Sequence, residues 1–151
     1  MKVERVYTRT VLATTRGAGL AEAAAAMSRF RVGALVVMED GGGRGPAGIV
    51  TDRDLALQGF ASESSTVESV MTPVVATVRE DSDVHEPLEI MRAHGVRRLV
   101  VTDGRGALRG ILSIDDIVDG LSTELAAAAA VLKGEIRRDA AGVGDVKVGG
   151  A

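Results

Sequence analysis

Two short runs of the sequence combine a hydroxyl and a carboxylate at the same spacing. GIVTDRDLAL (48–57) places Thr51 three residues before Asp54, and GILSIDDIVD (110–119) places Ser113 three residues before Asp116. In each run, an apolar stretch typical of a buried strand ends at the hydroxyl residue and a helical pattern follows. The four side chains are therefore expected at two strand-to-helix junctions.

Each hydroxyl–carboxylate pair supports two interpretations. In a capping box, the hydroxyl accepts the backbone N–H three residues on, and the acid accepts the N–H of the hydroxyl residue. In a nucleotide site, the helix N-terminus and the hydroxyl face phosphate, while the carboxylate accepts hydrogen bonds from ribose hydroxyls. Gly48 and Gly110 would let a base or a backbone segment approach closely. The spacing alone favours the capping box.

The two runs belong to an internal duplication of a unit of about 60 residues. Segment 20–40 aligns with segment 84–104 at a constant offset of 64 residues. The offset is 62 residues between Gly48 and Gly110, because the first unit carries two extra residues in its glycine-rich loop. Upstream, VLATT (11–15) matches VVATV (74–78).

Both units predict the element order β-α-β-β-α. The helix after the first strand has an apolar stripe with the spacing of one helix face, and glycine-rich or Asp-Gly turns separate the later strands. A last helix is expected to start at Thr51 or Ser113 and to stop near Gly59 or Gly120. One unit cannot close a core alone, so we expect an α+β (α/β) fold in which the two units pack sheet to sheet. The predicted strands are 11–15, 34–38 and 47–50, then 74–78, 99–102 and 109–112.

Together with the segments VMTP (70–73) and HGVRRLVVTD (94–103), the duplicated unit resembles a tandem CBS domain pair. The family takes its name from cystathionine beta-synthase, and the pair is also called a Bateman module. The resemblance covers about residues 5–121 and is to the free-standing bacterial type. It implies pseudo-two-fold symmetry and a regulatory, energy-sensing role. Adenosine-containing nucleotides (AMP, ADP, ATP or S-adenosylmethionine) would bind in clefts between the repeats, and occupancy would be transmitted to a partner protein.

The resemblance also implies which residues contact the ligand. Thr51 and Asp54 would serve one cleft, and Ser113 and Asp116 the other. The purine would lie against strand edges at Ala34, Leu35 and Thr14 in the first repeat and at Arg98, Leu99 and Thr77 in the second. Arg97 or Arg98 would reach phosphate, since a guanidinium is a planar clamp for it. A solvated strand end explains the two arginines equally well. Core packing explains Leu35 and Leu99 equally well. Tyr7 departs from the family pattern, because it stands where the second repeat has Met71 of its VMTP segment.

Composition argues against several other classes of protein. The net charge of −3 and the aromatic content of 2% do not suit a nucleic-acid binder. The chain has no cysteine, no signal-peptide pattern at its N-terminus and no apolar run long enough to span a membrane. We therefore expect a cytoplasmic protein without membrane contact.

The sequence predicts no enzyme and no obligatory cofactor. His85 and His94 are the only histidines, and their spacing does not make a zinc pair. No catalytic nucleophile motif is present, so we expect neither a catalytic nor a metal site. Carboxylates beside Asp54 and Asp116 leave room for Mg²⁺ only as a companion of a bound nucleotide.

The predicted organisation is a first repeat at 1–62, a linker at 63–69, a second repeat at 70–121, a helix at 122–138 and a flexible tail at 139–151. An apolar stripe runs along the last helix through Leu121, Leu125, Ala128, Leu132 and Ile136. It would pack on the protein's own body or on a second subunit, and we expect a homodimer. The alternative to a nucleotide sensor is a structural or dimerisation adaptor whose clefts stay empty and which binds a protein partner.

Overall fold

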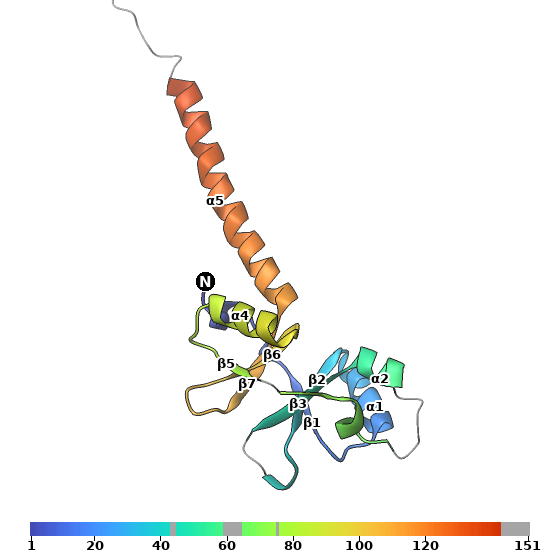
Figure 1. Ribbon diagram of the computed structural model, residues 1–151. Coiled ribbons are helices and arrows are strands. Elements are labelled where there is room, and N and C mark those ends of the chain that lie inside the picture. Colours follow the sequence, from blue (N-terminus) through green and yellow to red (C-terminus); the bar gives the residue numbers. More distant parts are fainter. Residues whose placement is uncertain (43–44, 59–64, 75, 143–151) are drawn as a thin grey trace, which may run out of the picture. The chain divides into compact units, whose positions relative to one another are not determined.

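Two small sheets form the first of two structural units in the computed structural model (Figure 1). The structure describes residues 1–42, 45–58, 65–74 and 76–142, and its units are Met1–Ile117 and Val118–Ala151. The first sheet has the order β1-β2-β3-β4, with strands Leu12–Thr15, Ala34–Met38, Pro46–Thr51 and Thr72–Pro73. The second has the order β5-β6-β7, with strands Thr77–Arg79, Arg98–Thr102 and Leu108–Ser113.

Each sheet has the same connectivity, which confirms the duplicated β-α-β-β-α unit. The first and second strands of each repeat are parallel and joined by a crossover helix. The second and third strands are antiparallel. The crossover helices are α1 (Leu20–Phe30) and α4 (His85–His94). The remaining helices are η1 (Val3–Arg5), η2 (Asp40–Gly42), α2 (Asp52–Gln58), α3 (Val67–Val70) and α5 (Ile114–Gly142).

The two sheets pack against each other through the faces that point away from the core of their own repeat. Leu35 and Val37 of β2 lie in the core of the first repeat, while Val36 between them points to the opposite face and is buried as well. In the second repeat, Val100 is buried in the same way between core residues Leu99 and Val101. Both faces of each sheet are therefore covered. Ile49 of β3 and Val100 of β6 line one cavity, so the expected sheet-to-sheet packing is confirmed.

The first strands of the two repeats are related by a register different from the predicted one. Ala13 pairs with Val36, and Thr77 pairs with Val100, so Thr77 is the counterpart of Ala13 and not of Thr14. Thr14 instead corresponds to Val78, which is 1% exposed in the second core. The similarity between the sequences of 11–15 and 74–78 aligns the two strands with an error of one residue. Because side chains alternate between the faces of a strand, this error exchanges the two faces.

Each sheet is completed by the segment that precedes the other repeat. β4 pairs with β3 of the first repeat, and Val67 and Val70 of α3 lie in the first core. Reciprocally, Thr8 pairs with Ile111 on β7, and Val3 lies in the second core. This exchange ties the two repeats together through backbone pairing as well as through side chains.

Gly48 and Gly110 lie where these exchanged segments cross the strands. A Cβ on Gly48 would come within 2.7 Å of the Thr72 carbonyl oxygen, and one on Gly110 within 2.1 Å of the Thr8 carbonyl oxygen. The close approach expected at both glycines is therefore made by the chain's own backbone. Tyr7, whose ring carbons would also meet a Cβ on Gly110, occupies the place that Met71 occupies over Gly48.

Arg16 fastens α3 to the first repeat. Its Nε and Nη2 donate to the two carboxylate oxygens of Glu39 at 2.8 Å, and its Nη1 donates to Glu68 of α3 at 2.9 Å. These hydrogen bonds hold the pKa of the Glu39 carboxyl below its ordinary value and raise the pKa of Arg16.

We expect Arg16→Ala to lower the melting temperature by a few degrees, because Arg16 joins segments that are distant in the sequence. Arg79→Ala is the matched control, since Arg79 makes a similar two-bond contact with Asp81 only two residues away. Differential scanning calorimetry of both variants measures the difference. Equal losses from the two variants would show that Arg16 does not hold α3.

The last helix is longer than predicted. A stop was expected near Gly120, followed by a separate helix at 122–138, but α5 runs without interruption from Ile114 to Gly142. One glycine inside a helix costs about 1 kcal/mol relative to alanine. The alanine-rich stretch that follows favours helix strongly enough for the helix to continue past Gly120. Of the expected flexible tail, residues up to 142 are helical and 143–151 lie outside the described residues. None of the described helices combines the length and apolar composition needed to cross a membrane.

Candidate functional site

A cavity of about 250 Å³ lies between the two sheets and draws on both repeats. The first repeat contributes β3 up to its last residue, Thr51. The connecting segment contributes β4 and Ala76, and the second repeat contributes the start of β6 with the loop before it. The lining residues are Ile49, Thr51, Thr72, Pro73, Val74, Ala76, Gly95, Val96, Arg97, Arg98, Leu99 and Val100.

Thr51 and Asp54 form a closed capping box at the edge of this cavity. The Thr51 backbone N–H and hydroxyl both donate to Asp54 Oδ2, at 2.8 and 2.9 Å, and the Asp54 N–H donates to the Thr51 hydroxyl at 3.2 Å. Ser113 and Asp116 repeat the arrangement, with distances of 2.8, 2.7 and 3.1 Å. The capping-box interpretation is therefore confirmed in both repeats.

This geometry limits what each side chain offers to a ligand. A hydroxyl has one proton, and that of Thr51 is used by Asp54. Both hydrogen bonds to the Asp54 carboxylate fall on Oδ2, and among the described residues none donates to Oδ1. An ionised carboxylate accepts at both oxygens, so Asp54 can take further donors at Oδ1 while the cap stays intact.

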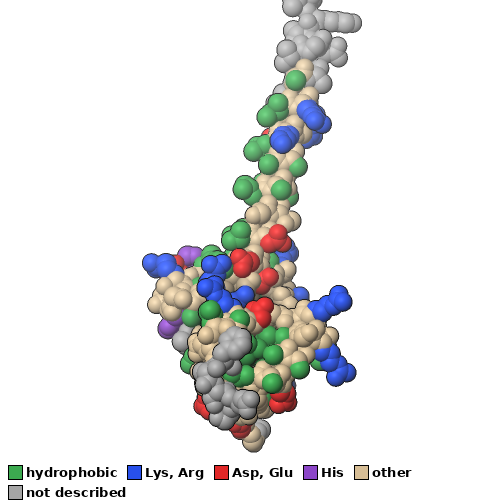
Figure 2. Space-filling view, turned by 90° about the vertical axis from the view of Figure 1, so that its right-hand side faces the viewer, with side chains coloured by type: hydrophobic (Ala, Val, Ile, Leu, Met, Phe, Trp, Pro, Cys, Tyr) green, Lys and Arg blue, Asp and Glu red, His purple; other side chains and the backbone are tan. Residues whose placement is uncertain are grey.

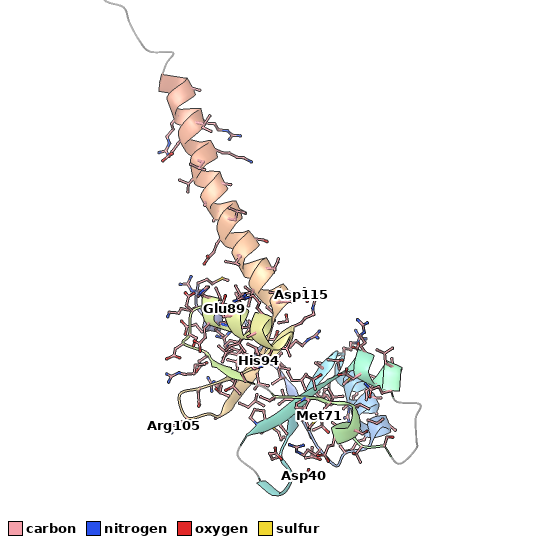
Figure 3. The ribbon with its side chains drawn as sticks, viewed as in Figure 1. Asp40, Met71, Glu89, His94, Arg105 and Asp115 are labelled. Atoms are coloured by element: carbon pink, nitrogen blue, oxygen red, sulfur yellow. The ribbon has the colours of Figure 1, made fainter. Side chains whose placement is uncertain are left out.

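Two arginines give the cavity its charge. Arg97 and Arg98 line it at the start of β6, and no acidic residue is among its lining residues. The Arg97 side chain is 73% exposed, and its Nη2 lies 3.6 Å from Oδ1 of Asp115 in the first turn of α5 (Figure 3). An exposed ion pair at this distance contributes little to stability, so the guanidinium can turn towards a bound anion with little loss of free energy.

The sequence-predicted site residues fall into three groups. Thr51, Arg98 and Leu99 line the cavity, and Asp54 is hydrogen-bonded to one of them. The remaining six residues do not line it. Three of these pair across strands with cavity residues: Ala34 with Thr51, Ser113 with Arg98, and Thr77 with Val100. The other three are Leu35 in the first core, Thr14 on β1 and Asp116 in the second capping box.

Several cavity residues were not predicted. The sequence predicts Ile49 only as part of a strand, but it lies on the face of β3 opposite the core residue Val50 and lines the cavity. Thr72 and Pro73 are predicted only as part of the VMTP segment at the start of the second repeat, and nothing in their sequence indicates that they form a strand in the first sheet. Val96 could have been found, because it directly precedes the two arginines in the predicted loop.

The structure contains no cluster of three or more histidine and acidic residues that could hold a metal ion, within the ranges that it describes. His85 and His94 lie at opposite ends of α4, and Figure 3 labels His94 at its C-terminal end.

Comparisons with known proteins agree with the fold. The family model for the CBS domain matches residues 3–58 and 67–123. Protein YlbB of Bacillus subtilis is 39% identical over 99 residues, which are 64% of this chain and 66% of that protein. The chain thus spans about two thirds of the length of this curated relative.

Two solved structures show the same architecture with ligands. The CBS domain protein PAE2072 of Pyrobaculum aerophilum, complexed with AMP, has a TM-score of 0.65 and 26% identity, covering 77% of this chain and 89% of that one. The CBS domain pair of protein MJ0100, in complex with 5′-methylthioadenosine and S-adenosyl-L-methionine, has a TM-score of 0.68. It covers 82% of this chain and 98% of that one at 22% identity, and its likeness concerns the fold.

Proposed function

The chain belongs to the CBS domain family, and we propose that it is a regulatory module that binds a phosphorylated adenine nucleotide in the cavity between its two sheets. Occupancy would favour one arrangement of the repeats and so change how a partner protein is engaged, because a ligand shifts only those states to which it binds unequally. The observation that carries the proposal is the presence of Thr51, Arg97 and Arg98 around one cavity.

The cavity offers a complementary surface for each part of a nucleotide. Ile49, Val96 and Val100 provide apolar walls for a base. Asp54, which is hydrogen-bonded to Thr51 at the edge of the cavity, can accept hydrogen bonds from ribose hydroxyls at Oδ1 without loss of the cap. Arg97 and Arg98 can bind phosphate oxygens, for which guanidinium groups provide paired donors.

The pseudo-symmetric positions of the other repeat carry their arginines elsewhere, since Arg31 stands where the cavity has Gly95. Gly33 and Ala34 stand where the second repeat has Arg97 and Arg98. Arg9 stands where the cavity has Pro73, and its guanidinium lies 4.5 Å from the centre of the Tyr7 ring. We propose that phosphate binds on the side of Arg97 and Arg98, because these two adjacent guanidiniums line the described cavity.

Thermal unfolding with AMP, ADP, ATP and S-adenosylmethionine tests the proposal. A ligand present at 100 times its Kd stabilises the native state by about 2.7 kcal/mol, which is a measurable shift. We expect Asp54→Ala to abolish the shift caused by ATP, and Asp116→Ala to retain it. The two variants are matched, because each removes the same type of cap and each ligand shift is taken from the variant's own melting temperature.

The second candidate function is the adaptor with empty clefts. The observation that favours it is that both carboxylates already complete a cap, so neither needs a ligand to explain its presence. If no adenosine compound shifts the melting temperature, the adaptor replaces the sensor. If Asp54→Ala and Asp116→Ala retain the ATP shift equally, the assignment of the nucleotide to the cleft at Asp54 is wrong.

A further inference from the structure

The second structural unit presents an apolar face that has no partner within that unit. Among the described residues, Val118–Ala151 contains only the continuation of α5. Leu121, Leu125, Leu132 and Ile136 on this helix are 42%, 72%, 61% and 67% exposed. Figure 2 shows hydrophobic side chains following one side of the helix. Scattered exposed leucines are ordinary, but a continuous apolar row along several turns is typical of an interaction surface.

The row is symmetric about its own middle. Leu121 and Ile136 are equally far from the point midway between Ala128 and Ala129, and so are Leu125 and Leu132. If a second copy of the helix ran in the opposite direction, Leu125 would face Leu132 of that copy, and Leu121 would face its Ile136. Alanines would meet at the centre, where small side chains allow two helices to approach closely.

The charges of α5 favour the same orientation. Between Val118 and Ala130 the helix carries Asp119 and Glu124 and no basic residue. From Val131 onwards it carries Lys133, Arg137 and Arg138 against two acids. Figure 2 shows the basic side chains gathered towards the C-terminal end and acidic ones towards the beginning. Opposed helices would bring unlike ends together and oppose their dipoles, whereas parallel helices would bring like charges together.

We propose that α5 of this chain pairs with α5 of a second copy in antiparallel orientation, through the row from Leu121 to Ile136. The charge order and the symmetry of the row identify the occupant as the same chain. This pairing does not depend on nucleotide binding, so its failure would leave the cleft assignment untouched.

Light scattering after gel filtration of the full chain tests the pairing. The expected mass is that of two chains, and Leu125→Glu should reduce it to that of one. Ala126→Glu is the matched control, since it adds the same charge at the next position, off the apolar row, and should remain a dimer. A wild-type chain with the mass of one would overturn the proposal and would indicate that the row packs on the chain's own body. A dimer that survives Leu125→Glu would overturn it as well.

Single cysteines determine the orientation, because the natural sequence contains none. Under mild oxidation, an equal mixture of Leu121→Cys and Ile136→Cys chains should form a mixed disulfide, while each variant alone should not crosslink. Facing positions in an antiparallel pair bring the two sulfurs within reach, and identical positions far from the centre do not. Efficient crosslinking of Leu121→Cys alone would show a parallel pair and overturn the proposal.

Discussion

Replacing Gly110 by alanine should lower the free energy of unfolding by about 3 kcal/mol, the upper part of the range that overpacking typically costs. The added Cβ would lie 2.1 Å from the Thr8 carbonyl oxygen and within 2.8 Å of two carbons of the Tyr7 ring. Backbone cannot rotate away as a side chain tip can, so the N-terminal segment must move off β7. Thr8 and Ile111 would then lose their two backbone hydrogen bonds, of 2.9 and 3.1 Å. Urea denaturation measures the loss.

Alanine substitutions at two other glycines serve as controls for the loss of stability expected of Gly110→Ala. Gly45→Ala should be nearly neutral, because among the described residues no atom beyond its chain neighbours lies within 4 Å of the added Cβ. Gly48→Ala should be intermediate, since the contact at 2.7 Å with the Met71 sulfur can relax but that with the Thr72 oxygen cannot. If Gly110→Ala were as stable as Gly45→Ala, the crossing of the N-terminal segment over β7 would be wrong.

The crossing of the N-terminal segment over β7 is also a feature that the sequence did not predict. The duplication predicted the order of the elements in each repeat, because apolar periodicity is repeated whenever the unit is repeated. It did not predict that residues 1–8 would complete the second repeat and residues 67–73 the first. Periodicity shows which face of a strand is apolar, but it does not show which segment covers that face. The second buried face, at Val36 and Val100, depends on the same missing information.

The candidate site was predicted unevenly for a related reason. Thr51–Asp54 and Ser113–Asp116 form local caps, which depend on residues three apart and are therefore visible in sequence. Thr14 and Thr77 depended on aligning two short strands, and a single-residue error exchanged their faces. Thr72 and Pro73 enter the cavity through the exchanged segment, so no local pattern could place them there.

The helix after Ser113 shows a third limit, in which a local rule was outweighed by its surroundings. Gly120 predicted a helix end, but the residues on both sides favour helix and the pattern continues. The continuous α5 carries the apolar row in one piece from Leu121 to Ile136, as a pairing surface requires.

Removing both cavity arginines should weaken ATP binding about 10- to 100-fold while leaving adenosine binding nearly unchanged. A hydrogen bond to a charged group contributes roughly 1.5–3 kcal/mol, and each 1.4 kcal/mol is tenfold in affinity. In Arg97→Ala/Arg98→Ala, the apolar walls and the Thr51–Asp54 cap remain, so the nucleoside part keeps its contacts. Titration calorimetry with ATP and with adenosine measures the two affinities separately.

A matched control variant distinguishes direct contact between the arginines and the phosphates from long-range attraction by net charge. Arg92→Ala/Arg105→Ala removes the same charge from α4 and from the β6–β7 turn, outside the residues that line the cavity. It should lower ATP affinity only slightly, and that small loss should vanish in high salt because distant charges are screened. Equal losses from the two double variants would show that net charge attracts the nucleotide and that Arg97 and Arg98 do not touch its phosphates. A loss confined to Arg97→Ala/Arg98→Ala and to ligands that carry phosphate would place the phosphate at the start of β6, where the other repeat has only Gly33 and Ala34.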